Sequence, residues 1–187
     1  VNWYTGTDGL LKTGMAVTTQ GFTICTSGDR DDTIEGEPAL QMKPHFKMLA
    51  RHGPAVMSRF HVRVTTSRAR DFQNVDLIDT PGLLDADSSG GGYPFDVNGI
   101  ILELAAQADI VLVFMDPHGQ ATGKRTMNVV RDLDRARMSD KVRFFLTKAD
   151  SFTEAKDLIK TIGQTAAALA KHLTTQHGMD VSTMWIP

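Results

Sequence analysis

Short apolar runs alternate with segments of helical periodicity throughout the second half of the chain. The runs are rich in β-branched and aromatic residues, as buried strands are, and they cover residues 75–78, 110–115, 142–146 and 182–186. Between them, apolar residues recur every three or four positions over residues 100–108, 124–137 and 154–173. The order strand, helix, strand, helix predicts an α/β fold: a mostly parallel sheet with helices on both faces.

The first half has a less regular pattern. Its opening residues suit the end of a helix that Gly6 and Gly9 terminate. Clean alternation predicts strands at residues 22–26 and 61–66, the second antiparallel to its neighbour if the polar stretch after it forms a hairpin-like loop. Three other segments lack this alternation. We expect an exposed loop or hairpin at residues 29–38, short helical pieces at residues 44–60, and a loop around three glycines at residues 85–96.

Length and composition restrict the class of protein. A chain of 187 residues with 41% hydrophobic and 22% charged residues is ordinary for one globular core, so we expect a single domain over residues 1–187. The net charge of −2 gives no reason to expect a nucleic-acid partner. The lone Cys25, expected in a strand core, suits a reducing, cytoplasmic compartment. The six histidines lack metal-ligand spacing, and no apolar run of membrane-spanning length occurs.

The first chemical motif is Asp79-Thr80-Pro81-Gly82, which directly follows a predicted strand. In a parallel sheet, ligands bind at the carboxyl ends of strands. Asp79 could hold Mg²⁺ there, because this hard cation uses few carboxylates and keeps several waters. Gly82 would let its N–H approach a terminal phosphate without a side chain in the way. The alternative is a Pro-Gly turn that only ends a buried strand.

The second motif, Thr147-Lys148-Ala149-Asp150, also follows an apolar strand. The carboxylate of Asp150 could accept two parallel hydrogen bonds from N1–H and the 2-amino group of guanine, a pairing that adenine cannot offer. The stem of Lys148 could lie over the base plane. A surface Lys and Asp at a strand end is the alternative, which the presence of the first motif disfavours.

Two adjacent threonines, Thr18 and Thr19, precede the strand at residues 22–26. A nucleotide switch needs a hydroxyl at such a place to reach Mg²⁺ and a carbonyl to orient water. Thr18 is the better candidate of the two. Adjacent threonines in a loop are otherwise ordinary turn residues.

A phosphate-binding loop of the form G-x-x-x-x-G-K-[ST] is absent from the 187 residues. The nearest approach, residues 119–126, is one residue short, and Arg125 replaces the Mg²⁺-binding hydroxyl. We interpret residues 123–125 as a helix start. The chain begins with Val1 rather than Met, and we expect the phosphate loop to lie just before it, in a longer protein.

Together, these motifs resemble a known family. Asp79-Thr80-Pro81-Gly82 paired with Thr147-Lys148-Ala149-Asp150 is the signature of translational-type and dynamin-type GTPase domains. Other stretches are similar to the dynamin superfamily, nearest the branch of EH-domain ATPases and sarcalumenin-like proteins, and these stretches are residues 2–4, 18–19, 44–47, 57–60, 93–98 and 114–119.

The resemblance implies a P-loop NTPase fold of the G-domain type, without its first strand and P-loop. It implies GTP or GDP and Mg²⁺ as ligands, with hydrolysis coupled to movement of residues 13–21 and 83–96. Its site residues would be Thr18 and Gly82 for catalysis, Thr18 and Asp79 for the metal, and Thr19, Thr147, Lys148 and Asp150 for the nucleotide. Leu83 stands where Ras-like enzymes carry the water-positioning Gln.

The same resemblance implies a homodimer formed across the nucleotide face, and peripheral attachment to a membrane through regions outside these residues. Two other functions remain open. The first alternative is an ATP-binding relative of the EH-domain type, since those proteins carry a similar Lys-x-Asp motif. The second is a degenerate interaction domain that binds no nucleotide. A P-loop kinase is disfavoured, because Lys148 and Asp150 would then have no role.

Overall fold

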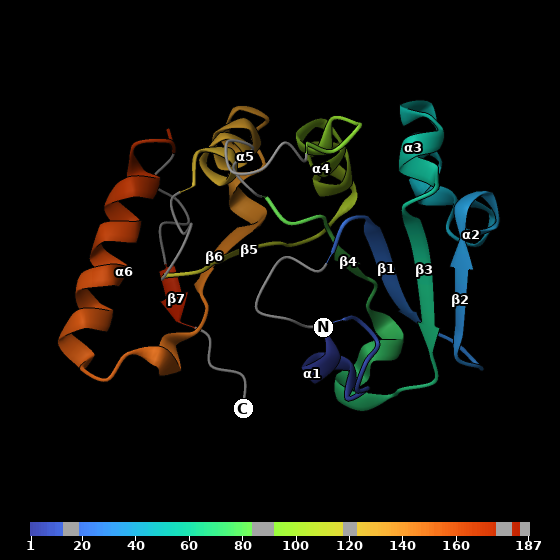
Figure 1. Ribbon diagram of the computed structural model, residues 1–187, viewed down its shortest axis with the longest axis horizontal. Helices are drawn as coiled ribbons and strands as arrows, with labels where there is room; N and C mark the ends of the chain where they lie inside the picture. Colours follow the sequence, from blue (N-terminus) through green and yellow to red (C-terminus); the bar gives the residue numbers. More distant parts are fainter. Residues whose placement is uncertain (13–18, 84–91, 118–122, 175–180, 184–187) are drawn as a thin grey trace. The chain divides into compact units, whose positions relative to one another are not determined.

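The computed structural model describes residues 1–12, 19–83, 92–117, 123–174 and 181–183 (Figure 1). The chain divides into two compact units. Unit 1 comprises residues 1–82 and 93–97, and unit 2 comprises residues 83–92 and 98–187. Both contain helices and a sheet, so the predicted α/β class is confirmed.

Unit 1 is built on a four-stranded sheet with the order β2-β3-β1-β4 (Figure 1). The strands are β1 (Phe22–Ser27), β2 (Asp32–Glu35), β3 (Phe60–Thr65) and β4 (Leu77–Asp79). β1 and β3 are parallel, and the β2–β3 and β1–β4 pairs are antiparallel. The helices are α1 (Asn2–Thr5), α2 (Gly36–Met42) and α3 (Pro54–Met57), with 3₁₀ helices η1 (Pro44–His52) and η2 (Ala69–Asn74).

In unit 1, the burial of side chains depends on the position of their strand in the sheet. The inner strand β1 buries Phe22, Ile24 and Cys25 completely, whereas the edge strand β2 has alternating exposure. Complete burial of a side chain such as Phe22 contributes about 1.5–3 kcal/mol. Burial also raises the pKa of the Cys25 thiol to about 12, so this residue behaves as the core residue that the sequence predicts.

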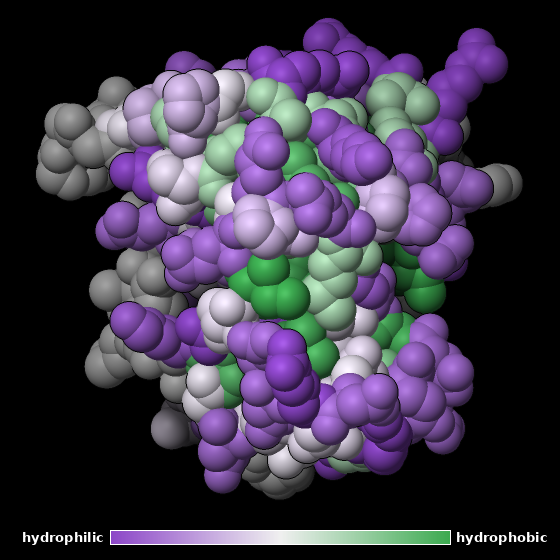
Figure 2. Space-filling view, turned by 90° about the vertical axis from the view of Figure 1, so that its right-hand side faces the viewer, coloured by the Kyte–Doolittle hydropathy of each residue, from purple (hydrophilic) through white to green (hydrophobic). Residues whose placement is uncertain are grey.

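The face shown in Figure 2 is mainly hydrophilic, with apolar residues gathered near its centre.

One local prediction in unit 1 is wrong, and the condition attached to a second, a hairpin after residue 66, is not met. The polar stretch at residues 29–38 contains β2 and the start of α2, because Ile34 pairs with Val62 of β3. The strands at 60–65 and 77–79 are not neighbours, since β1 lies between them. Residues 69–74 form η2 rather than a hairpin turn, and Arg70 and Asp71 adopt positive φ there.

Unit 2 contains a parallel three-stranded sheet with the order β5-β6-β7. Its strands are β5 (Val111–Met115), β6 (Val142–Leu146) and β7 (Val181–Thr183). Its helices are α5 (Lys124–Arg135) and α6 (Ala155–Ala170), with short 3₁₀ turns η4 (Ser139–Lys141) and η5 (Ala149–Ser151). The helix α4 (Val97–Gln107) begins on the last residue of unit 1 and continues in unit 2.

The strand β5 departs from the central, buried strand that its apolar run predicts. It pairs only with β6 among the described strands, and Leu112 and Phe114 are 47% and 50% exposed. The ring of Phe114 stacks on that of Phe145 of β6, with centroids 5.7 Å apart. One side of β5 therefore lacks a strand neighbour within the described residues.

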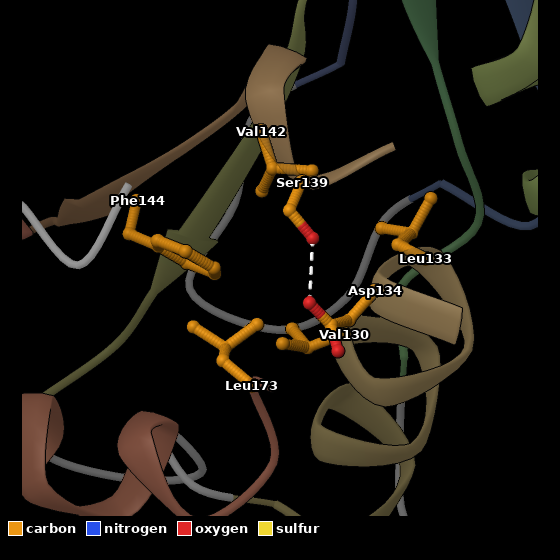
Figure 3. A pocket seen from close by; sticks show the side chains of 7 residues that line it. All are labelled: Val130, Leu133, Asp134, Ser139, Val142, Phe144 and Leu173. Atoms are coloured by element: carbon orange, nitrogen blue, oxygen red, sulfur yellow. Dashed lines mark hydrogen bonds between the residues drawn. The ribbon is translucent and has the colours of Figure 1, made fainter. Parts of the chain in front are cut away.

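A buried carboxylate, Asp134, lies near the end of α5 and is bonded to Ser139 (Figure 3). It also connects α5 to Thr174, in the segment after α6. It accepts hydrogen bonds from Ser139 Oγ at 2.7 Å, Thr174 Oγ1 at 2.6 Å and Thr174 N at 2.9 Å. The surrounding hollow, lined by Val130, Leu133, Phe144 and Leu173, is about 10 Å³ in volume. A hollow of this size holds at most about one water. Asp134 is therefore part of the packing of unit 2.

We expect Asp134→Ala to lower the free energy of unfolding by about 2–4 kcal/mol, because it removes a buried carboxylate that accepts three hydrogen bonds. Urea denaturation would measure the loss. Asp132→Ala is the matched control on the same helix: its carboxylate forms partly exposed ion pairs with Arg131 and Arg135, so we expect a loss below about 1 kcal/mol. Equal losses in both variants would contradict the role of Asp134.

Candidate functional site

Three predicted site residues of unit 1 lie together. Thr19 Oγ1 donates a hydrogen bond to Asp79 Oδ2 at 3.0 Å, and Gly82 N donates to Thr19 O at 3.3 Å. The antiparallel pairing of β1 and β4 explains the meeting, since the register places Thr23 opposite Asp79. The segment before β1 therefore lies beside the end of β4. We call these residues the Thr19–Asp79–Gly82 cluster.

The environment of Asp79 differs from that of a surface carboxylate. Burial raises its pKa above the ordinary value, and the hydrogen bond from Thr19 opposes that rise. A partly desolvated carboxylate gains from a cation beside it. Its donor set, one carboxylate and one hydroxyl oxygen, fits a Mg²⁺ ion that keeps most of its waters. Within the described residues, no group of three or more Asp, Glu, His or Cys side chains forms an alternative metal site.

Sequence reasoning missed a third hydrogen bond at this cluster, which comes from a fourth residue. The hydroxyl of Tyr93 donates to the carbonyl oxygen of Gly82 at 3.2 Å. The ring of Tyr93 stacks on Phe95, which in turn contacts Phe22 of β1. Tyr93 and Phe95 directly follow the glycine-rich stretch in the sequence. Their position there is the signal that could have placed them beside the cluster.

The second motif lies at the end of β6 in unit 2. Both the N–H and the hydroxyl of Thr147 donate to the carbonyl of Met115 at the end of β5, at 2.9 and 3.1 Å. Lys148 follows in the left-handed conformation, with φ of 51° and ψ of 34°. Asp150 lies in the short turn η5 and is exposed. The motif therefore presents its carboxylate to solvent beyond two paired strand ends.

Lys148 has an ion-pair partner that sequence reasoning did not identify. Its Nζ lies 2.6 Å from Asp116 Oδ2. Asp116 follows β5 just as Asp79 ends β4, and this repeated position of an acidic residue could have singled it out. The carbonyl of Lys148 accepts from Ser151 Oγ at 2.5 Å. These contacts fix both the head group and the backbone of Lys148.

The remaining predictions differ in outcome. Thr18 and residues 118–122 lie outside the described residues, so the roles assigned to Thr18 stay predictions. Gly123 directly precedes α5, and the interpretation of residues 123–125 as a helix start is confirmed. The first motif lies in unit 1 and the second in unit 2. A hollow in unit 1, lined by Asp8, Asp31 and Arg63 among others, contains none of the predicted site residues.

Comparison with known proteins gives relatives that share most of this chain. No family model matches. EH domain-containing protein 2 of Arabidopsis thaliana is 29% identical over 87% of the chain and 29% of its own length. EH domain-containing protein 3 of Homo sapiens is 25% identical over 88% of the chain and 30% of its length. The chain thus spans about 30% of the length of these curated relatives.

Solved structures extend the likeness to the fold. A chain of an oligomerised bacterial dynamin pair, described as a mechanism for long-range sensing and tethering of membranes, superposes with a TM-score of 0.62. It is 17% identical, and the match covers 98% of this chain and 30% of that one. With the paired motifs and the sequence relatives, this likeness identifies the chain as a relative of the EH domain-containing proteins that has the dynamin-superfamily G-domain fold, a P-loop NTPase fold.

Proposed function

We propose that this chain is the G domain of a longer dynamin-like protein that binds GTP with Mg²⁺ and hydrolyses it. The Thr19–Asp79–Gly82 cluster is the observation that carries the proposal. Its members come from positions about 60 residues apart, yet they bring a hydroxyl, a partly buried carboxylate and a glycine N–H to one strand end. These are the groups that a metal-bound terminal phosphate requires.

Each group has a separate task. Asp79, with a hydroxyl from the 18–19 pair, would hold Mg²⁺, which when bound neutralises charge on the phosphate oxygens. The Gly82 N–H, which donates to Thr19 O at 3.3 Å in the structure, would exchange that bond for one to the terminal phosphate. Backbone carbonyls near Thr18 would orient the attacking water. In unit 2, Asp150 would accept hydrogen bonds from the polar edge of guanine, and the stem of Lys148 would lie over the plane of the base. Thr147, which is bonded to the end of β5, would complete the base site.

We further propose that residues 1–187 form a single, incomplete G domain. The sequence contains no phosphate-binding loop, and β4 and β5 each pair on one side only among the described strands. A further strand that carries the loop would supply the missing β-phosphate contacts. Hydrolysis would then be coupled to movement of residues 13–21 and 83–96.

Dimerisation through the nucleotide face, membrane remodelling and a peripheral cytoplasmic location belong to the same proposal. The likeness to an oligomerised bacterial dynamin pair that senses and tethers membranes supports self-association and membrane attachment. No helix within the described ranges is long and apolar enough to cross a membrane.

Calorimetry on the full-length protein tests the proposal. We expect Mg²⁺-dependent binding of GTP that is at least tenfold tighter than binding of ATP. Preference for ATP would favour the EH-domain ATPase alternative, and binding of neither would favour a nucleotide-independent interaction domain. Residues 1–187 alone should show weak or no turnover, and rapid hydrolysis by them would contradict an incomplete domain.

A further inference from the structure

An aromatic stack adjoins the Thr19–Asp79–Gly82 cluster and has no role in the proposed function so far. The rings of Tyr93 and Phe95 are stacked, with centroids 5.7 Å apart and planes 30° apart. Phe95 meets the ring of Phe22 at 6.1 Å, and the guanidinium of Arg59 lies 5.8 Å from the Phe95 centroid. Since Phe22 is completely buried on β1, the stack is anchored in the core of unit 1.

The Tyr93 end of this stack contacts the backbone of Gly82. The hydroxyl of Tyr93 donates to Gly82 O at 3.2 Å, while Gly82 N donates to Thr19 O at 3.3 Å. Glycine has the widest conformational freedom of any residue, so contacts on both sides determine where its N–H points. Thr19 and Tyr93 flank Gly82 from distant parts of the sequence and hold its two adjoining peptide groups.

We propose that Tyr93 is a positioning residue for recognition of the terminal phosphate, acting through the carbonyl of Gly82. This inference rests on the proposed function, in which the Gly82 N–H contacts that phosphate. When the Gly82 N–H leaves Thr19 O for a phosphate oxygen, the bond from the Tyr93 hydroxyl to Gly82 O still holds the glycine. Loss of the hydroxyl removes that hold. Only nucleotides that carry the terminal phosphate are affected, because a diphosphate makes no contact with Gly82.

The test compares Tyr93→Phe with the wild-type full-length protein. This change removes one hydroxyl and keeps the ring that stacks on Phe95. One hydrogen bond of this kind corresponds to about three- to tenfold in affinity. We expect the affinity for a non-hydrolysable GTP analogue to fall by that factor in calorimetry with Mg²⁺, the affinity for GDP to stay unchanged, and kcat to fall.

Tyr4→Phe is the matched control, because the Tyr4 hydroxyl also donates to a backbone carbonyl, that of Arg70, at 3.1 Å. It should leave the ratio of triphosphate to diphosphate affinity as in the wild type. An unchanged ratio in Tyr93→Phe, or an equal loss for both nucleotides, would overturn the inference alone. A wild-type protein that binds neither nucleotide would overturn the proposed function and this inference with it.

Discussion

Asp79→Asn will lower Mg²⁺-dependent hydrolysis by the full-length protein by about 100-fold or more, the range typical for loss of one preorganised electrostatic contact. The amide has nearly the shape of the carboxylate and can still accept the hydrogen bond from Thr19. It lacks the negative charge that a hard divalent cation requires. A phosphate-release assay across a Mg²⁺ titration would show the loss, with partial recovery at high Mg²⁺.

The same substitution should not destabilise the protein at neutral pH. Burial raises the pKa of Asp79, so the folded state binds the proton more tightly than the unfolded state does. The contribution of Asp79 to the free energy of unfolding is greatest below the ordinary pKa of about 4. It falls as pH rises through the raised pKa of the folded state. At pH 7 the ionised carboxylate therefore costs stability, and asparagine removes that cost. We expect the variant to be at least as stable as wild type at pH 7, with the difference vanishing toward pH 4.

Asp76→Asn is the matched control. The carboxylate of Asp76 lies 2.6 Å from Lys43 Nζ and 2.6 Å from Thr26 Oγ1, outside the Thr19–Asp79–Gly82 cluster. This change should reduce stability and leave hydrolysis intact, the reverse of the result at Asp79. If both variants hydrolyse GTP at the wild-type rate, Asp79 is not a metal ligand.

The sequence pattern was sufficient for elements whose signal is local. The run at 142–146 coincides with β6, and the periodicity at 124–137 contains α5. Asp79 stands at the end of a strand as predicted. These predictions depend on the alternation or periodicity of neighbouring residues, which burial of one face imposes directly.

Features that depend on distant pairing could not be predicted in this way. The insertion of β1 between β3 and β4 is a matter of strand order, which the composition of a single strand does not encode. The partner of Lys148 comes from the end of the adjacent strand β5, 32 positions away. The exposure of Leu112 and Phe114 likewise depends on which strands flank β5, because the apolar run itself fits a central strand equally well.

Asp150→Asn will lower the affinity of the full-length protein for GTP by about 100-fold, since two charge-assisted hydrogen bonds to the base are replaced by one neutral bond and a donor-to-donor conflict. The contact between Lys148 and Asp116 at 2.6 Å does not involve the substituted residue, so the Lys148 side chain should stay in place. The substitution therefore isolates recognition of the polar edge of the base.

The asparagine amide should also create a new preference. Xanthine presents N1–H as a donor and O2 as an acceptor, which match the Oδ1 and Nδ2 of asparagine. Competition binding should thus show xanthosine triphosphate overtaking GTP in Asp150→Asn, while Asp157→Asn, at an exposed position in the first turn of α6, retains the wild-type order. A variant that binds GTP as the wild type does would show that Asp150 does not read the base. Tighter binding of ATP than of GTP by the wild type, unaffected by the substitution, would likewise show that the base is not recognised through Asp150.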